Sequence, residues 1–169
     1  MLRRPADELI DQLDETGKVI GVVSRAEMRR RRLPHRCVYL LVFNSRGEVF
    51  IHQRTPTKEI FPAFWDVCVG GLPAAGEPFV DAVQREALEE IGVAVTPEEL
   101  FPILYRDEQF VVHGMVYRAV HDGPFTFQAE EVARGEFVRV DELELRFGRE
   151  RFCPDGQAVW AEFGRRFNF

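Results

Sequence analysis

Three glutamates lie within about one helical turn of each other in the segment GLPAAGEPFVDAVQREALEEIGV, residues 71–93. They are Glu86, Glu89 and Glu90, and like charges at such spacings repel each other on a helix. An ordinary surface helix would place lysines among them, yet the only basic residue of this helix is Arg85. Hard divalent cations such as Mg²⁺ and Mn²⁺ prefer oxygen ligands, so these carboxylates are suited to hold a metal ion.

The apolar positions of the same segment predict which helix face is buried. Five apolar residues fall on one arc at about 100° per residue: Phe79, Val80, Val83, Ala87 and Ile91. Glu90 lies inside this arc and Glu86 at its edge, and an uncompensated buried charge is costly. Arg85 is expected to point to a different side, which leaves a metal ion to meet the carboxylates. The alternative is a solvated acidic face. Pro78 is expected at the first helical position and Gly92 just past the end.

The spacing of this segment is similar to the Nudix box, G-x5-E-x7-R-E-U-x-E-E-x-G-U, at every fixed position. The matching residues are Gly71, Glu77, Arg85, Glu86, Glu89, Glu90 and Gly92, with Ala87 and Val93 at the hydrophobic positions. Such a match would arise by chance on the order of once in 10⁹ starting positions at average residue usage. The chain therefore resembles the metal-dependent pyrophosphohydrolases of the Nudix superfamily, and this resemblance implies an α/β/α sandwich.

The resemblance assigns chemistry to the glutamates and to the glycines before the helix. Glu86, Glu89 and Glu90 would hold one or more cations, Mg²⁺ or alternatively Mn²⁺, that neutralise a diphosphate and activate water. Family members differ over which carboxylate acts as the general base, and Glu86 is the preferred candidate here. The carbonyl of Gly70 is expected to join the metal shell, since glycine lets the backbone come close to a metal or phosphate.

Two further expectations concern groups around the box. Arg85 and Glu77 are expected to pair and so fix the loop on the helix. In the family an additional metal ligand often comes from the loop before a late strand, and here the segment QAEEVARGEF offers Glu131 or Glu130. The alternative for Glu131 and Glu130 is that they are ordinary surface acids.

A longer segment, residues 33–77, resembles the isopentenyl-diphosphate-isomerase-like branch of the superfamily. On that likeness Arg54 and Lys58 match residues that contact the diphosphate, and two neighbouring cations also suit a polyanion on electrostatic grounds. Ordinary surface charges are the alternative for this pair.

The residues of the isomerase reaction itself are largely missing. Gly70 stands where the isomerases have their catalytic cysteine, Leu72 stands where a histidine belongs, and Cys68 comes two residues early. His35 fits one of the isomerase metal histidines, with a structural role as the alternative. The sequence therefore predicts a hydrolase on an isomerase-like frame.

Composition limits the class of protein. The 169 residues are most simply one domain, and 46% hydrophobic with 30% charged residues is typical of a soluble globular chain. No apolar run reaches the roughly 18 residues that span a bilayer. The three cysteines form no CxxC pair, which favours reduced thiols and a cytoplasmic location. The net charge of −6 argues against nucleic-acid binding. The run Arg29–Arg32 is expected to be a solvated basic face, with an anionic ligand or RNA as the alternative.

The surrounding pattern predicts an α+β fold, a mixed β-sheet with packed helices, that must position these groups. Residues 1–33 are expected to form a polar lead-in with a short strand near 19–23 and a short helix. A hairpin is predicted over 37–54, and further strands over 64–70, 100–106, 110–120 and 136–140. Residues 155–169 are expected to form a C-terminal helix whose apolar face docks on the core: Val159, Trp160, Phe163 and Phe167.

Together these features predict a Mg²⁺-dependent hydrolase that cleaves a diphosphate linkage in a nucleoside diphosphate derivative or a similar small organic pyrophosphate. Two alternatives stay open. One is an isopentenyl-diphosphate-isomerase-like enzyme in which Cys68 takes over a catalytic role. The other is a non-catalytic module that binds a diphosphate ligand. The expected partner is the small-molecule substrate, and family analogy alone suggests a homodimer.

Overall fold

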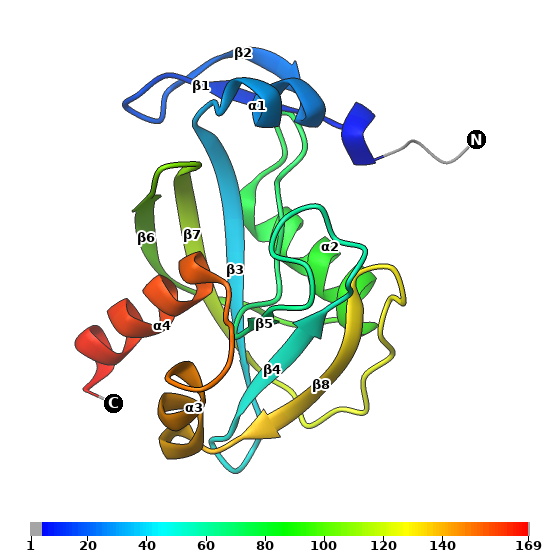
Figure 1. Cartoon of the computed structure of the whole chain (residues 1–169), viewed down its shortest axis with the longest axis vertical. Coiled ribbons are helices and arrows are strands. Elements are labelled where there is room, and N and C mark those ends of the chain that lie inside the picture. The colour runs from blue at the N-terminus through cyan, green and yellow to red at the C-terminus, as the bar shows by residue number, and fades with distance from the viewer. Residues whose placement is uncertain (1–4, 169) are drawn as a thin grey trace.

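Two β-sheets and four α-helices make up the described part of the chain, residues 5–168 of a computed structural model (Figure 1). The N-terminal elements are η1 (Pro5–Asp7), β1 (Leu9–Leu13), β2 (Val19–Ser24) and α1 (Arg25–Arg31). The strands that follow are β3 (His35–Phe43), β4 (Val49–Arg54), β5 (Trp65–Asp66), β6 (Glu98–Arg106), β7 (Val111–Val120) and β8 (Val132–Val138). The remaining helices are α2 (Phe79–Ile91), α3 (Val140–Phe147) and α4 (Pro154–Phe167).

The main sheet has six strands in the order β5-β4-β3-β7-β6, and β8 pairs with β4 outside this path. Only the β3–β7 pair is parallel among these described strands, running from His35↔Val112 to Phe43↔Val120. β4 pairs with β3 at Phe43↔Val49 alone and then diverges from it. The freed edge of β3 bonds instead to the loop before α2, through Leu40 to Val69 and Val38 to Gly71. This divergence opens the sheet next to α2.

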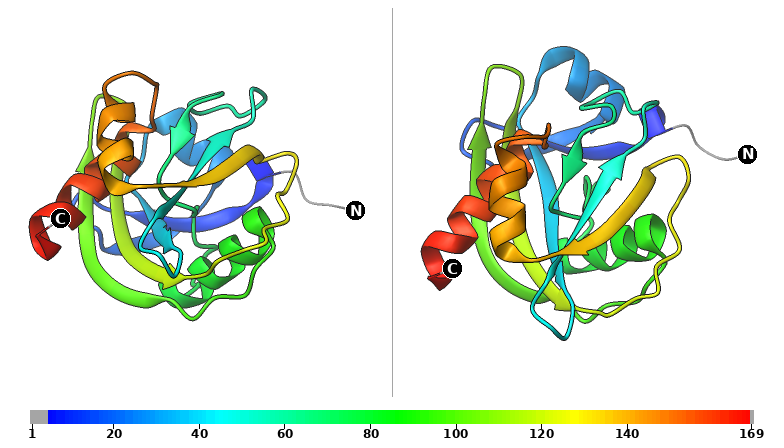
Figure 2. Two further views of the ribbon diagram at one scale, coloured as in Figure 1. Left: turned by 90° about the horizontal axis from the view of Figure 1, so that it is seen from below. Right: turned by 60° about the horizontal axis from the view of Figure 1, so that its bottom comes forward.

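Helices cover both faces of the sheet, as Figure 2 shows with α2 on one side and α3 and α4 on the other. One buried cluster joins α2 to the β3 side chains Val38, Leu40 and Val42. The other joins α3 and α4 to the alternate β3 side chains, such as Leu41 and Phe43. Successive strand residues point to opposite faces, so a single buried strand serves both clusters. The predicted α+β sandwich is confirmed.

Helix α2 follows its predicted course with two corrections. Pro78 is the residue before the helix rather than its first residue, and Gly92 ends the helix with φ 71°, as expected for a glycine past the last turn. Val80 is exposed, and Ala82 is buried in its place. Glu90 is buried on the core-facing side, as the periodicity predicts.

The N-terminal region has a strand that its polar sequence conceals. β1 pairs antiparallel with β2, where the sequence predicts only a polar lead-in before the strand. Its buried Asp11 accepts a hydrogen bond of 2.7 Å from Arg36 and one of 3.0 Å from the backbone N–H of Gly76, so partners far along the chain satisfy this carboxylate. Ile10, Val23 and Met28 form a small core under α1. This N-terminal layer lies across one end of the main sheet (Figure 1).

Three other boundaries differ from the sequence-based expectation. Within the 64–70 region only Trp65 and Asp66 form a strand, because the rest pairs with β3 as an irregular loop. β8 ends at Val138, and the unexpected helix α3 follows with Leu143 as its one buried residue. α4 docks through Val159, Trp160 and Phe163, whereas Phe167 is exposed, and residue 169 lies outside the described range. No helix within residues 5–168 is long and apolar enough to cross a membrane.

Candidate active site

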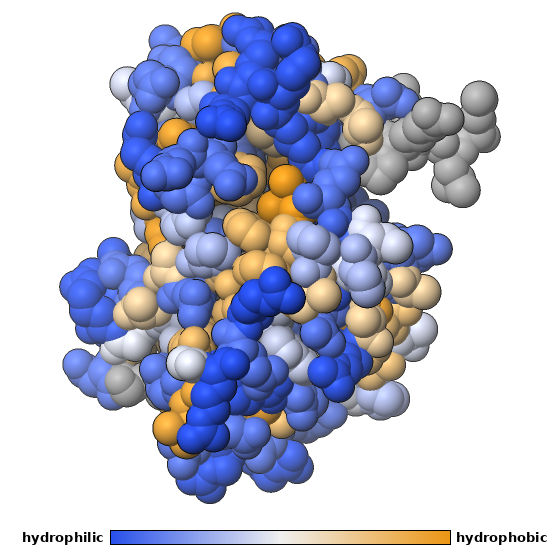
Figure 3. Space-filling model, viewed as in Figure 1, coloured by the Kyte–Doolittle hydropathy of each residue, from blue (hydrophilic) through white to orange (hydrophobic). Residues whose placement is uncertain are grey.

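A cavity of about 650 Å³ lies where β3 and β4 diverge, between α2, α1 and the loop after β4. Figure 3 shows hydrophobic atoms recessed in a hollow below the N-terminal layer, with hydrophilic side chains around it. The cavity-lining residues include all three glutamates of α2, Gly70, Gly71, Arg54, Lys58 and Glu131. The structure therefore brings together the residues that the sequence predicts from three separate segments.

The three glutamates of α2 differ in burial. Glu90 is 8% exposed, the Glu86 side chain is 12% exposed and that of Glu89 is 51% exposed. Burial raises the pKa of Glu86 to about 7, although the neighbouring Arg85 acts in the opposite direction. Burial also raises the pKa of Glu90 well above its ordinary value, and the charges of Glu86 and Glu131 raise it further. A cation among these carboxylates would relieve their mutual repulsion.

Arg85 holds the glutamates and the preceding loop together. Its Nε and Nη2 donate hydrogen bonds of 2.9 Å each to the two carboxylate oxygens of Glu77, which is the expected pair. The expectation that Arg85 points away from the other glutamates is wrong: its Nη1 donates to Glu86 at 2.9 Å and to Glu89 at 3.2 Å. Glu89 comes four residues after Arg85, and side chains four apart on a helix are neighbours. Part of the cluster's charge is thus compensated without a metal.

Two glycines beside the carboxylates come very close to neighbouring atoms. A Cβ on Gly71 would lie 2.6 Å from Glu86 Oε1, and a Cβ on Gly70 would lie 2.0 Å from the backbone oxygen of Val38. The Val38 oxygen belongs to the backbone, so the loop reaches β3 only because Gly70 lacks a side chain. The Glu86 carboxylate is the end of a flexible side chain, so a Cβ on Gly71 would displace it rather than the backbone.

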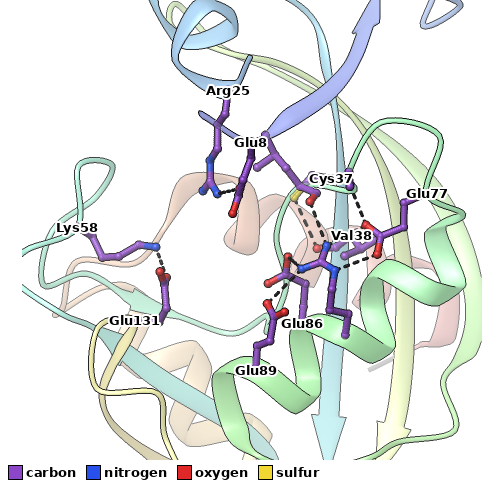
Figure 4. Close-up of polar contacts among 12 residues, drawn as sticks. Glu8, Arg25, Cys37, Val38, Lys58, Glu77, Glu86, Glu89 and Glu131 are labelled. Atoms are coloured by element: carbon purple, nitrogen blue, oxygen red, sulfur yellow. Dashed lines mark hydrogen bonds and ion pairs between the residues drawn. The ribbon is translucent and has the colours of Figure 1, made fainter. Parts of the chain in front are cut away.

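The opposite wall is built by β4 and β8. Their pairing places Arg54 beside Val132, so the loop after β4 meets the residues before β8. Lys58 forms an ion pair with Glu131 across this junction (Figure 4). Arg54 donates to the backbone oxygen of Ile60 at 3.0 and 3.2 Å. The positive charges of Lys58 and Arg54 oppose the rise in the pKa of Glu90 that burial causes, so this wall lies close to the carboxylates of α2.

The choice between Glu131 and Glu130 can be compared with this geometry. Glu131 lines the cavity, whereas Glu130 is absent from the lining and its backbone oxygen accepts a 2.9 Å hydrogen bond from Thr55. Among residues 5–168, no three His, Cys, Asp or Glu side chains are arranged ready to hold a metal ion. The donors are nevertheless hard carboxylate oxygens in a cavity, which suit Mg²⁺. Lys58 occupies one oxygen of Glu131 and would have to release it, whereas Arg85 contacts one oxygen each of Glu86 and Glu89 and leaves the other for a metal ion.

The cavity floor carries an acid pair that the sequence does not indicate. Asp66 and Asp155 both line it, and Tyr39 donates a 3.0 Å hydrogen bond to Asp155. Burial and the Asp155 charge raise the pKa of Asp66 to about 7. These residues come from β5, α4 and β3, and no local spacing relates them.

His35 and Cys68 also lie in the cavity wall, and Trp65 lies in the core. His35 is buried, and its Nδ1 lies 3.1 Å from the backbone oxygen of Leu33, while burial lowers the pKa of its ring. Burial raises the pKa of the Cys68 thiol well above its ordinary value.

The basic run Arg29–Arg32 is also divided between cavity and solvent. Arg29 and the preceding Arg25 line the cavity, while Arg30 and Arg31 are exposed and pair with Glu27. The predicted solvated face next to the site therefore holds for Arg30 and Arg31, whereas Arg29 is half-buried in the cavity wall. Arg25 and Arg29 are four residues apart, a spacing that places both on one helix face and could have indicated their shared position in the cavity wall.

An α/β/α sandwich whose cavity holds clustered carboxylates opposite basic side chains defines a class of hydrolases that act on phosphate anhydrides. The NUDIX domain model matches residues 33–155, and the chain belongs to the Nudix hydrolase family. It is 42% identical to an uncharacterized Nudix hydrolase of Streptomyces coelicolor, SCO1686, over 95% of this chain and 90% of that one. These matches confirm the predicted hydrolase class, and the family uses divalent metal ions.

Solved structures agree with the fold. DR0079 from Deinococcus radiodurans is 29% identical, with a TM-score of 0.79 over 94% of this chain and 98% of that one. The Nudix domain of Shewanella oneidensis NrtR, solved in complex with ADP ribose, is 16% identical with a TM-score of 0.64 over 86% and 99% of the two chains. The second likeness concerns the fold alone.

Proposed function

We propose that this chain hydrolyses a diphosphate linkage of a nucleoside diphosphate derivative or a similar small organic pyrophosphate, with Mg²⁺ as the preferred ion. One observation carries the proposal: a single cavity sets the buried carboxylates Glu86 and Glu90 opposite the cations Arg54 and Lys58. A diphosphate and its metal need both kinds of group within reach.

The residues divide between metal and phosphate. Glu86, Glu89 and Glu90 would hold the metal together with the Gly70 carbonyl and Glu131. When bound, the ion would offset the charge of the diphosphate and increase the acidity of the attacking water. Glu86 would accept the proton of that water as general base.

Arg54 and Lys58 would bind and orient the diphosphate. Lys58 is now paired with Glu131, so binding requires an exchange: the ammonium group moves to a phosphate oxygen while the carboxylate becomes free for the cation. Both charges of a half-buried pair gain new partners in this exchange, and neither is left alone. Metal and diphosphate should therefore each bind more tightly in the presence of the other.

Arg85 and Glu77 would act by position. Their two 2.9 Å hydrogen bonds join the loop to α2, and the same guanidinium contacts Glu86 and Glu89. The nucleoside part of the proposal is an extension from the Shewanella neighbour, which shares the fold and was solved in complex with ADP ribose, a nucleoside diphosphate derivative. The expected homodimer and cytoplasmic location stay predictions.

An isomerase-like activity is the second candidate, favoured by the position of Cys68 in the cavity wall. Burial raises the pKa of its thiol well above the ordinary value, so the thiol would stay protonated at neutral pH and be a poor nucleophile. Full activity of a Cys68→Ala variant on whatever substrate is found would exclude this role.

The test is release of phosphate or pyrophosphate from nucleoside di- and triphosphates, nucleotide sugars, dinucleotides and isoprenyl diphosphates with Mg²⁺ or Mn²⁺. Wild type should turn over one of these groups, and Glu90→Gln should not. Glu142→Gln, an exposed carboxylate on α3, is the matched control and should retain activity. Turnover that survives in Glu90→Gln would contradict the assigned carboxylates.

A further inference from the structure

Helix α1 presents two arginines to the cavity and two to solvent. The side chains of Arg25 and Arg29 are 19% and 26% exposed, whereas those of Arg30 and Arg31 are 71% and 49% exposed. Residues four apart share a helix face, so Arg25 and Arg29 point the same way. Of the four arginines of α1, only Arg25 and Arg29 line the cavity. Figure 4 shows the Arg25 guanidinium directed from α1 toward the space between Lys58 and Glu86.

The present partners of this inner pair are exposed carboxylates. Arg25 forms an ion pair of 2.9 Å with Glu8, and Arg29 forms one with Glu59. Both glutamates are more exposed than their arginines, and exposed ion pairs contribute little to stability. The Nε of Arg25 has no hydrogen-bond partner. A phosphate can therefore replace these carboxylates at small cost.

Arg25 and Arg29 add positive charge to a cavity that already holds Arg54 and Lys58. Burial and the charges of Arg25 and Arg54 lower the pKa of Arg29, which shows that these cations are close enough to repel one another. Arg25 also acts on Glu86, and Glu131 acts on Arg29, so the pair extends over both cavity walls. Arg54 and Lys58 already provide two cations for a diphosphate. Arg25 and Arg29 provide two more, and their present partners Glu8 and Glu59 are exposed enough to give way to a further anion.

We propose that Arg25 and Arg29 form a second phosphate-binding subsite, and that the preferred substrate is a polyphosphate with at least one phosphoryl group beyond the scissile diphosphate linkage. This inference rests on the proposed function, because the diphosphate position defines where the extra group lies. Arginine suits the task, since its planar guanidinium donates two parallel hydrogen bonds to a phosphate. The N-terminal layer is thereby part of the substrate site.

The test compares binding of inorganic tripolyphosphate and inorganic pyrophosphate by calorimetry without added metal. Arg25→Gln and Arg29→Gln should each weaken tripolyphosphate binding about ten-fold or more, as expected for a lost hydrogen bond to a charged group, and should weaken pyrophosphate binding less. Arg30→Gln and Arg31→Gln remove the same charge from the outer face of the same helix and should leave both affinities nearly unchanged. Arg29→Lys keeps the charge and should restore part of the loss, and thermal unfolding confirms that each variant is folded.

Equal losses for both ligands would overturn the second subsite, because the arginines would then bind the diphosphate itself. Equal losses in the outer-face variants would also overturn it, since the effect would come from net charge alone. The two proposals can fail separately. If wild type prefers tripolyphosphate through Arg25 and Arg29 but hydrolyses nothing in the panel, the subsite stands and the proposed function fails.

Discussion

The two walls of the cavity hold their charges in different ways. On the α2 wall, one guanidinium makes four hydrogen bonds to three carboxylates, and the helix beneath is packed into the core. On the opposite wall, one lysine meets one carboxylate: Lys58 lies in the loop after β4, and Glu131 directly precedes β8. The difference teaches that the α2 wall is a fixed frame, whereas the opposite wall is an exchangeable ion pair that a ligand can open.

The largest expected effect comes from the buried carboxylate of the fixed wall. Glu90→Gln should lower kcat by about 10³-fold, because an amide keeps the shape but removes the charge that would hold the metal. Steady-state kinetics on the substrate that the panel identifies would measure this loss. A loss below ten-fold would mean that Glu90 is a structural residue rather than a ligand.

The same variant should be at least as stable as wild type without metal. Burial raises the pKa of Glu90, so the folded state binds more protons than the unfolded state above the ordinary value of 4.5. The wild-type free energy of unfolding therefore decreases as pH rises above that value, and the decrease should be smaller for Glu90→Gln. Urea unfolding between pH 5 and pH 8 tests this difference. The control variant Glu142→Gln should show the same pH dependence as wild type.

The second effect concerns the close approach of the loop to β3. Gly70→Ala places a Cβ against the backbone oxygen of Val38, which cannot move without shifting the strand. We expect a loss of about 3 kcal/mol in the free energy of unfolding. Gly47→Ala has nothing within 4 Å of its Cβ, although its φ of 77° adds some strain, and should lose less. Equal losses in chemical denaturation would contradict the account of Gly70.

The two walls also differ in how far the sequence predicts them. The α2 wall lies in one contiguous segment, so the spacing of Glu86 and Glu90 was enough to place one at the edge and one inside the buried face. The opposite wall depends on β4 pairing with β8, and the family resemblance could name Lys58 and Glu131 singly but not their contact. The contacts of Arg85 with Glu86 and Glu89 could not be predicted from helix faces alone either.

The fold shows the same division between local and distant information. Elements with regular periodicity, such as α2 and the β3–β4 hairpin, were predicted close to their observed bounds. β1 was missed because its buried Asp11 finds partners on residues 36 and 76, which no local pattern reveals. The acid pair Asp66 and Asp155 on the cavity floor was missed for the same reason, since nearly ninety positions separate its members.

A third effect distinguishes position from charge on the fixed wall. Arg85→Lys keeps the positive charge but cannot donate two parallel hydrogen bonds to Glu77 while reaching Glu86. We expect kcat to fall about ten-fold with little change in KM, because substrate binding depends on the other wall. A rise in KM with kcat unchanged would instead place Arg85 on the substrate.

The smallest effect tests the exchangeable wall itself. Glu131→Gln removes the partner of Lys58, so the freed ammonium group should bind inorganic pyrophosphate about five-fold more tightly without metal, the value of one weak ion pair. With Mg²⁺ the same variant should lose activity, because the carboxylate that joins the metal is gone. Glu130→Gln, next in sequence but outside the cavity lining, should change neither quantity. If Glu131→Gln weakened pyrophosphate binding without metal, Lys58 would need its carboxylate to be held in place, and the opposite wall would be as fixed as α2.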